Sequence, residues 1–418
     1  MRPIALLRRR HRLLRSQWYD SHAIRVLQRK KLVQLVNYAY SHVPYYRNLF
    51  DDEGLEPSHI RSLEDLHRIP ITTKETLRKL EPEQRIGNDY SEGTLIQEKT
   101  SGSTGEPFRT YFDPSFISTR DALFLRALHV AGYRPGMKLM LVTANDTKSR
   151  SYLRWRYASI RSSAEDLIAQ LDSFRPSVLY GCMTPLRIMA EHVKASKRKH
   201  HKPDIVISTA ESMDDRTRLL LQRVFDADVY DIYGLTESGM IAWECNAHDG
   251  YHLSEDTAII ETIADPDRNA ERLIVTNLEL KAMPMIRFQT DDLAATIART
   301  DCACGRTLRR LRRIEGRLVD CLTLADGEIV TPYRVTMSLE EIVGLERYQV
   351  IQTDSRHFTV RAEADPQVRS KLVPAVQTAM SDLVGRNAEV DVQFDSSIAP
   401  SSGQKFRVVA NRITSNCR

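Results

Sequence analysis

The first 90 residues repeat apolar positions at the three- and four-residue spacing of an amphipathic helix. The stretch VLQRKKLVQLVNYAYSHV keeps this spacing over residues 26–43, and Pro44 then interrupts it. Helical spacing places such side chains on one face, and a proline ends the pattern that precedes it. We therefore expect residues 1–90 to be mainly helical, with a break at Pro44.

Between residues 95 and 310 the pattern changes to short apolar runs that alternate with helical stretches. The expected strands are KLMLVTA, PSVLYG, DIVIST, DVYDIYG and RLIVTNLEL, and the expected helices include DALFLRALHVAG and RTRLLLQRVFD. Strands that alternate with helices are typical of α/β proteins with parallel sheets. We expect an α/β domain with a largely parallel core.

From about residue 318 the pattern changes again. RYQVIQTD, HFTVRAEA and AEVDVQFD are expected strands, and VRSKLVPAVQTAMSDLVG is an expected helix. This predicts a small α+β domain of about 100 residues, a common domain size. The Arg-rich RRLRRIEGRLVD that precedes it is a plausible hinge. The predicted organisation is a large N-terminal domain over residues 1–315, a hinge over 316–320 and a mobile C-terminal lid domain over 321–418.

Charge is concentrated at the N-terminus. The 418 residues have a net charge of +5, but residues 1–31 alone carry ten Lys or Arg and one Asp, so the remaining chain has a net charge of about −4. A body of this kind is not expected to bind nucleic acid. We expect a solvated, Arg-rich first helix with Leu7, Leu14 and Trp18 on one face.

No run approaches the ~18 consecutive apolar residues that span a bilayer. The N-terminus has neither a sustained apolar region nor a small-residue cleavage site, which argues against a secretory signal. We expect a soluble, cytoplasmic protein without a membrane span. The sequence leaves open whether it is a monomer or a homodimer.

A group of cysteines and histidines has the composition of a metal site. WECNAHDGYHLSED contains Cys245, His248 and His252, and CACG contains Cys302 and Cys304. Two thiolates two residues apart, with a Cys/His pair about 50 residues earlier, fit a closed, tetrahedral structural Zn²⁺. We take His252 as the fourth ligand, with His248 as the alternative. Free cysteines beside an exposed histidine are the other interpretation.

The stretch EKTSGSTGEPF at residues 98–108 is rich in glycine and hydroxyl groups. A flexible linker would explain this composition. However, the stretch lies between two β-prone runs, TLIQEKT and FRTYF. A turn of this kind presents backbone N–H groups and hydroxyls to one point, which suits a phosphate chain. It is not a P-loop, because GxxxxGK[ST] is absent.

Two expected strands end in polar residues. DIVISTAES leads into a helix, so Ser212 is either its N-cap or part of a ligand crevice at the carboxyl end of the strand. DVYDIYGLTESG offers the ring of Tyr233, the hydroxyl of Thr236 and the carboxylate of Glu237, an oxygen ligand suited to Mg²⁺.

Taken in order, these motifs resemble a known family. The order is TSGSTGEP, STAES, YGLTESG, RFQTDD, IEGR and SSGQKFR. It resembles the adenylate-forming superfamily of acyl-CoA synthetases, and most of all the phenylacetate–CoA ligase group with its capsule-biosynthesis relatives. The likeness to that group is strengthened by HVPYYR, IPITTKETLR and CACGR. The resemblance spans nearly the whole chain. The resemblance also implies the zinc site, which relatives with C-x-C-G and this histidine-bearing segment share.

The resemblance implies a role for each matching residue. Ala210 and Glu211 would border the adenine of ATP, with Tyr233 packed on its face and Gly234 beside it. Thr236 would contact the α-phosphate and Glu237 would help to hold Mg²⁺. The residues implied to hold the β- and γ-phosphates are Thr100, Ser101, Gly102, Ser103, Thr104 and Gly105.

Three further residues are implied to contact the nucleotide. Asp292 would accept hydrogen bonds from the ribose diol, Arg317 would reach the ribose or phosphate, and Lys405 would contact the α-phosphate region during adenylation. The chain departs from the family pattern in three places. Asp291 stands where the family often has glycine, Val319 stands at the first hinge acid position, and Gln404 adds one residue before Lys405.

The implied activity is that of an ATP-dependent, AMP-forming ligase. It would activate a small carboxylic acid, with an aromatic acid expected, as an acyl-adenylate and transfer it to coenzyme A. The implied cofactors and substrates are ATP, Mg²⁺, coenzyme A and a structural Zn²⁺. Two alternatives remain: delivery of the acyl group to an amine or a carrier-protein thiol, and a non-catalytic nucleotide-binding interaction protein with this fold.

Overall fold

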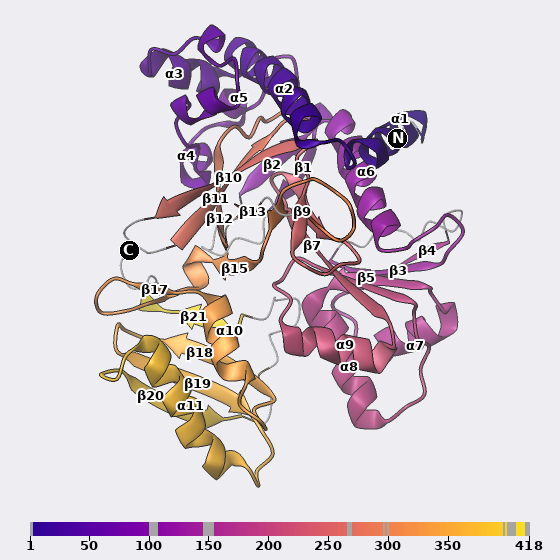
Figure 1. Ribbon diagram of the computed structural model, residues 1–418, viewed down its shortest axis with the longest axis vertical. Helices are drawn as coiled ribbons and strands as arrows, with labels where there is room; N and C mark the ends of the chain where they lie inside the picture. Colours follow the sequence, from indigo (N-terminus) through magenta and orange to yellow (C-terminus); the bar gives the residue numbers. More distant parts are fainter. Residues whose placement is uncertain are drawn as a thin grey trace.

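A computed structural model describes residues 3–99, 108–144, 154–265, 270–295, 297–298, 301–395, 398 and 407–413. Figure 1 shows three parts: helices of the N-terminal region, two sheets in the centre and a small C-terminal unit. Within the part of the chain that the structure describes, none of the helices combines the length and apolar character needed to cross a bilayer.

The N-terminal region is helical, as predicted. Asp20 caps α2 by accepting a hydrogen bond from the Ala23 backbone N–H, and α3 starts at Pro44, which breaks the helical pattern as expected. The helices pack through a buried cluster that includes Leu32, Tyr46 and Phe50. The helices of this region are α1 (Pro3–Ser16), α2 (Ser21–His42), α3 (Pro44–Asp52), α4 (Lys74–Arg78) and α5 (Pro82–Arg85).

The largest sheet has nine strands in the order β13-β14-β9-β8-β7-β6-β5-β3-β4. Strands β3 to β7 are parallel, which confirms the expected parallel core, whereas β8, β9, β14 and β13 are antiparallel. The strands are β3 (Leu139–Thr143), β4 (Trp155–Ser159), β5 (Val178–Cys182), β6 (Ile205–Thr209), β7 (Asp228–Leu235), β8 (Gly239–Glu244), β9 (Tyr251–Leu253), β13 (Ile297–Ala298) and β14 (Arg310–Leu311).

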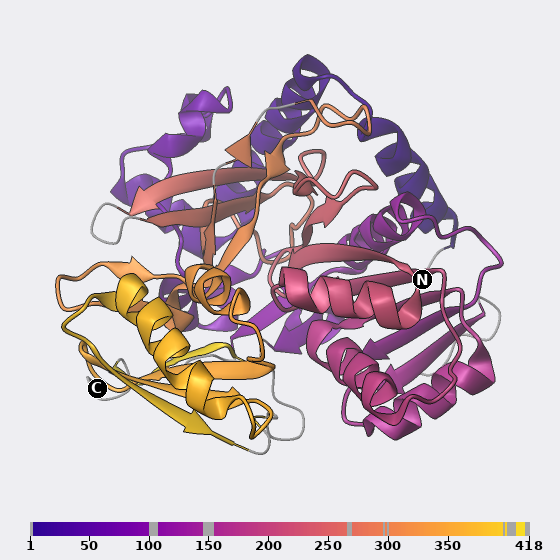
Figure 2. The ribbon, with the colours of Figure 1, turned by 60° about the horizontal axis from the view of Figure 1, so that its bottom comes forward.

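Helices cover both faces of the parallel half (Figures 1 and 2). Met140 and Val142 of β3 pack with α7 (Ala164–Phe174), α8 (Met183–Ser196) and α9 (Asp215–Phe225), whereas Leu139 and Leu141 pack with α6 (Pro114–Val130). Alternate side chains of a strand point to opposite faces, so both faces of β3 are apolar.

A second, four-stranded sheet is antiparallel throughout, in the order β10-β11-β12-β15. The run RLIVTNLEL belongs to this sheet and not to the parallel core, so its expected place was wrong. Only residues 266–269 connect β10 to β11, and so short a connection permits antiparallel pairing only. The strands are β10 (Ala258–Asp265), β11 (Ala270–Asn277), β12 (Phe288–Ala294) and β15 (Ile314–Arg317).

Two smaller units complete the fold. β1 (Ile96–Lys99) and β2 (Arg109–Phe112) form the antiparallel pair expected on either side of the glycine-rich stretch. The C-terminal unit has a four-stranded sheet, β20-β19-β18-β21, and its own hydrophobic cluster over residues 322–409. Its elements are β16 (Leu322–Thr323), β17 (Ile329–Val330), α10 (Pro332–Glu340), β18 (Arg347–Gln352), β19 (His357–Glu363), α11 (Arg369–Val384), β20 (Glu389–Phe394) and β21 (Val409–Asn411).

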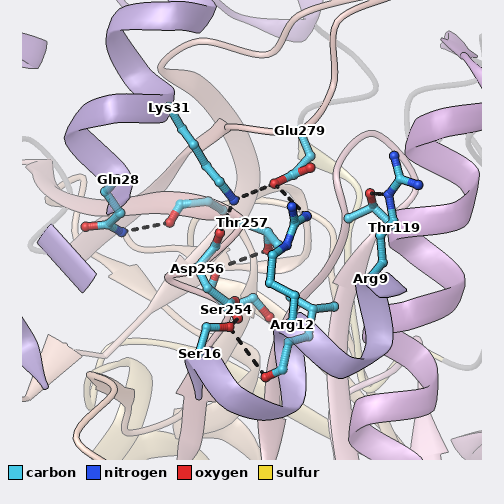
Figure 3. Close-up of polar contacts among 12 residues, drawn as sticks. Arg9, Arg12, Ser16, Gln28, Lys31, Thr119, Ser254, Asp256, Thr257 and Glu279 are labelled. Carbon is cyan, nitrogen blue, oxygen red and sulfur yellow. Dashed lines mark hydrogen bonds and ion pairs between the residues drawn. The ribbon is translucent and has the colours of Figure 1, made fainter. Parts of the chain in front are cut away.

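Helix α1 is attached more firmly than a solvated helix would be (Figure 3). Leu13 is only 1% exposed, and the Ser16 hydroxyl donates to Asp256, a buried carboxylate that also pairs with Arg126 at 2.7 Å. Leu7 and Trp18, in contrast, are 59% and 51% exposed. The helix is therefore not simply solvated: the face that contains Leu13 and Ser16 meets the body, whereas Leu7 and Trp18 are exposed.

A buried polar network lies among the central strands. Asp231 of β7 accepts hydrogen bonds from Ser208 of β6 and from the Tyr251 hydroxyl of β9, at 2.8 Å for the latter. Its backbone N–H donates to Glu244 of β8, which pairs with Arg218 at 2.7 Å. Burial, and then Glu244, raise the pKa of Asp231 to about 7.

Leu13→Ala should lower the free energy of unfolding by about 2–5 kcal/mol, because it leaves a cavity under α1. The control Leu7→Ala lies on the same helix but is exposed, and should change it by about 0.5 kcal/mol or less. Urea unfolding of both variants measures this. Equal, small effects of the two substitutions would contradict the docking of α1.

Asp231→Asn should remove part of the pH dependence of stability. With its pKa raised from 3.8 to about 7, the folded state binds the Asp231 proton more tightly than the unfolded state. The resulting stability is complete below the unfolded pKa and is lost as the pH rises through about 7. From pH 5 to pH 8 the wild type should therefore lose stability relative to the variant, by up to about 2.5 kcal/mol, since about two pKa units of the shift fall within this range. Parallel pH profiles in urea unfolding would contradict this.

Candidate active site

A large cavity lies where the two main sheets meet the C-terminal unit. Its volume is about 2010 Å³, and its lining includes residues at the carboxyl ends of β5, β6 and β7, residues of β12 and β15, and residues of α10 and β21. The carboxyl ends of parallel strands are the usual position of a ligand crevice in an open α/β sheet. The fold therefore provides one site to which several distant segments contribute.

The residues that the family resemblance implies for nucleotide binding come together at this cavity, as far as the structure describes them. They come from three strand ends and from the junction with the C-terminal unit. Those that line it are Ala210, Glu211, Tyr233, Gly234, Thr236, Glu237, Asp292 and Arg317. Thr100–Gly105 and Lys405 lie outside the described residues. Arg407 and Val409, which follow Lys405, do line the cavity.

The end of β6 forms a tight, irregular turn. Ala210 has a φ of +71°, a left-handed conformation that is uncommon for residues other than glycine. Glu211 accepts a hydrogen bond from the Thr184 hydroxyl at the start of α8. Asp214, and not Ser212, caps the following helix α9, by accepting from the Thr217 backbone N–H. The proposed capping role of Ser212 was therefore wrong.

Tyr233 and Asp292 connect the two main sheets within the cavity. The Tyr233 hydroxyl donates to Asp292 Oδ2 at 2.6 Å, and Arg317 Nε lies 3.6 Å from Asp292 Oδ1. Arg317 is the direct neighbour of Asp292 across the β12–β15 pair. Burial raises the pKa of Asp292, although Arg317 acts in the opposite direction. The Asp292 carboxylate accepts one hydrogen bond, on Oδ2, and pairs electrostatically with Arg317 on Oδ1, so it keeps acceptor capacity for further hydrogen bonds.

Glu237 pairs with a lysine that sequence reasoning gave no role. Lys74 Nζ lies 3.0 Å from Glu237 Oε1 and 2.7 Å from Asp291 Oδ2. Burial lowers the pKa of Lys74, but Glu237 and Asp291 outweigh it and the net pKa is raised. Asp291 is the carboxylate that stands where the family often has glycine, so Lys74 compensates its charge.

The signal for Lys74 was present in IPITTKETLR. Thr72 pairs with Phe288 at the start of β12, and the Thr73 hydroxyl caps α4 by accepting from the Thr76 N–H. These two contacts place Lys74 beside the strand that carries Asp291 and Asp292. Both partners of Lys74, Glu237 and Asp291, lie far away along the chain, Asp291 by 217 residues, so the local pattern could not identify them.

Four potential metal ligands come together next to the end of β8, which Cys245 follows directly. Their ligand atoms all lie within 4.8 Å of one another, with Cys245 Sγ 3.6 Å from Cys302 Sγ and Cys304 Sγ 3.3 Å from His252 Nε2. Burial lowers the pKa of His252 to about 4, so its imidazole stays neutral, as a metal ligand requires. None of these four residues is among those that line the large cavity.

His248 lies apart from this cluster. Its ring packs against Tyr230 with the centroids 4.9 Å apart, and its Nδ1 lies 3.6 Å from Glu244 Oε2. The loop continues through Gly250, with a φ of +77°, where an added Cβ would come within 2.6 Å of the Leu311 carbonyl oxygen. This close approach lets the chain reach β9 and brings His252, not His248, to the cysteines.

No family model matches the chain. Curated phenylacetate–coenzyme A ligases are similar to it. That of Thermus thermophilus is 29% identical in an alignment of 352 residues that covers 78% of this chain and 78% of the relative. That of Pseudomonas putida is 26% identical in an alignment of 425 residues that covers 94% of this chain and 95% of the relative.

Solved structures show the same fold. A 2-hydroxyisobutyryl-CoA ligase in its postadenylation state has a TM-score of 0.78 at 21% identity, with 94% of this chain and 91% of that chain covered. The thioesterification state, with CoA, has a TM-score of 0.65 at 21% identity, over 95% of this chain and 92% of that chain. The predicted α/β ligase fold is confirmed. Over most of its length the chain is similar to phenylacetate–coenzyme A ligases, and it shares its fold with an acid–CoA ligase.

Proposed function

We propose that the protein is an ATP-dependent, AMP-forming acid–CoA ligase that activates a small aromatic carboxylic acid as an acyl-adenylate and transfers it to coenzyme A. The observation that carries this is the convergence of Ala210, Glu211, Tyr233, Glu237 and Asp292 on one cavity. The likeness to phenylacetate–coenzyme A ligases over most of their length supports the acid and the acceptor.

Different residues at the cavity would contact different parts of the nucleotide. Asp292, oriented by Tyr233 and Arg317, is positioned to accept hydrogen bonds from the ribose diol. Ala210 and Glu211 border the base, and Thr236 and Glu237 lie toward the phosphates. Glu237 would hold Mg²⁺, which supplies positive charge where the phosphates carry negative charge. Glu237 is 5% exposed, and its Oε1 lies 3.0 Å from Lys74 Nζ.

Lys405 is the residue to which we assign the adenylation step. When a carboxylate attacks the α-phosphorus, negative charge builds up on the phosphate oxygens before pyrophosphate leaves. A positioned cation lowers the energy of that state. The product is a mixed anhydride, which a thiolate attacks at its carbonyl carbon without any enzymic nucleophile. The positions of Arg407 and Val409 at the cavity support a place for Lys405 close by.

We also propose that the C-terminal unit, residues 321–418, moves about residues 316–320. In the present arrangement Arg216 of α9 donates to the Glu340 carbonyl at 2.6 Å, and Arg347 of β18 pairs with Glu191 of α8. Both contacts cross between the large and small units, so a rotation would break them. The different TM-scores for two states of one relative, 0.78 and 0.65, are in line with such a movement.

The test of this function is acid-dependent release of pyrophosphate from ATP, with coenzyme A, an amine or a carrier protein supplied as acceptor. In this assay, Lys405→Ala should slow adenylation by about two to three orders of magnitude, because one charge-stabilising contact is lost. It should leave the reaction of supplied acyl-adenylate with coenzyme A nearly intact. Single-turnover kinetics of each half-reaction measure the difference.

Gln404→Ala is the matched control, because it changes the preceding residue and keeps the charge. It should leave both half-reactions near the wild-type rate. Equal losses of both half-reactions in Lys405→Ala would refute the assignment. No pyrophosphate release with any aryl or alkyl acid would refute the proposed function and favour a non-catalytic nucleotide-binding protein.

We propose that Cys245, His252, Cys302 and Cys304 hold a structural Zn²⁺. The S–S and S–N separations of 3.6 and 3.3 Å are close to those between ligands of one tetrahedral zinc ion. The ion would join the loop after β8 to the turn before β14. It would thereby hold the antiparallel half of the large sheet together, away from the chemistry.

Cys302→Ser should remove the zinc and lower the thermal unfolding midpoint, because a closed site needs all four ligands. Cys321→Ser is the control: it is also buried, but it lies outside the cluster and should keep the metal. Elemental analysis of the purified proteins should give about one zinc per chain in the wild type and the control. Zinc-free wild type, or Cys302→Ser with full zinc, would contradict the proposal.

A further inference from the structure

Helix α1 has two different faces. The inward face carries Leu13 and Ser16, which are buried, and Arg9, which is half-buried. The outward face follows the three- and four-residue spacing of one helical stripe, and all of its members are exposed. They are Ile4, Leu7, Arg8, His11 and Arg15.

Polar contacts fix which face points outward (Figure 3). Arg9 Nε donates to the Thr119 hydroxyl of α6 at 3.1 Å, and Ser16 donates to the buried Asp256. Lys31 of α2 donates to the Asp256 carbonyl at 2.6 Å and pairs with Glu279. With Leu13 inserted between these contacts, α1 cannot turn over. The outward stripe is therefore a permanent surface of the protein.

This surface is unusually apolar for an Arg-rich segment. Ile4 is 66% exposed, Leu7 59% and Trp18 51%, and Val26 at the start of α2 is 54% exposed. Of the nine large hydrophobic residues that are exposed in the described chain, five lie between residues 4 and 26. The Arg306 guanidinium lies 4.3 Å from the ring centroid of Trp18, so this indole is held in place. We call Ile4, Leu7, Arg8 and Arg15 of α1, together with Trp18 in the turn that follows the helix, the α1 surface.

The α1 surface belongs to the most positively charged part of the chain. Residues 1–31 carry a net charge of +9, whereas the rest of the chain is at about −4. Among the described residues, no ion pair is recorded for Arg8 or Arg15, whereas Arg12 lies 3.7 Å from Glu279. In both ribbon views α1 is on the opposite side of the molecule from α10 and α11, so a partner bound there would not block the C-terminal unit (Figures 1 and 2).

We propose that the α1 surface docks the protein onto an anionic lipid bilayer. Arginines attract anionic headgroups, and exposed aliphatic and indole side chains gain by entering the boundary between headgroups and acyl chains. A nucleic acid would neutralise Arg8 and Arg15 but would leave Ile4 and Leu7 in water. The combination of both residue types on one fixed helix face therefore favours a bilayer. The interaction is peripheral and requires no spanning segment.

Sedimentation of the full-length protein with vesicles tests this proposal. The wild type should bind vesicles in which about a third of the lipid is phosphatidylglycerol, but not pure phosphatidylcholine. Raising the ionic strength from about 0.1 M to about 1 M should weaken binding strongly, because the Debye length shrinks from ~10 Å to ~3 Å.

Two double variants separate the electrostatic contribution to vesicle binding from the apolar contribution. Arg8→Gln/Arg15→Gln should weaken binding about 25-fold, at roughly fivefold for each arginine near the surface. Ile4→Ser/Leu7→Ser should also weaken it at least tenfold, because the apolar part is lost. The matched controls, Arg356→Gln/Arg386→Gln and Val343→Ser, change exposed residues of the C-terminal unit and should bind like the wild type.

Pyrophosphate release and thermal unfolding midpoints should be the same in all these variants, since none of the positions lies at the cavity or in a buried cluster. Wild-type binding that is absent on anionic vesicles, or equally strong on neutral ones, would overturn the proposal. So would controls that lose as much binding as the α1 variants. Duplex DNA that binds more tightly than the vesicles, with Ile4→Ser/Leu7→Ser unaffected, would show a nucleic-acid surface instead.

Discussion

The hydrogen bond from Tyr233 to Asp292 is the contact on which the arrangement of the site depends. It joins β7 of the large sheet to β12 of the antiparallel sheet at 2.6 Å, in a place where both side chains are largely buried. Unpaired buried carboxylates are costly, so this contact and Arg317 together fix how the sheets meet. The cavity lies at that junction, and Tyr233, Asp292 and Arg317 are part of its lining.

The same junction connects ligand binding to the hinge. Arg317 is the last residue of β15, it pairs with Asp292, and the proposed hinge begins beside it at Gly316. Gly316 has a φ of +111°, and an added Cβ would come within 2.7 Å of Pro332 at the start of α10. A group bound at Asp292 therefore lies beside Arg317, which is itself part of the segment that positions the C-terminal unit. Val319 in place of the usual acid leaves Asp320, paired with Arg407 at 3.0 Å, as the carboxylate of this segment.

The sequence predicted the features that depend on local pattern. The strand ends that carry Glu211 and Glu237, the helical N-terminal region and the α+β unit were all visible from spacing alone. Lys74 was missed because its importance comes from Glu237 and Asp291, which lie far away along the chain. The docking of α1 was missed because Leu7 and Leu13 are equally apolar, and the contact of Ser16 with the distant Asp256 accompanies the burial of Leu13. For the same reason RLIVTNLEL could be recognised as a strand but not assigned to its sheet.

A crystal structure with a non-hydrolysable ATP analogue and a carboxylic acid would test the central claim most directly. We expect one nucleotide across the junction of the two sheets, with its ribose hydroxyls at Asp292, its phosphates beside Glu237 and the 100–105 turn, and the Lys405 ammonium near the α-phosphate. A nucleotide bound elsewhere, or these elements found around separate ligands, would contradict it.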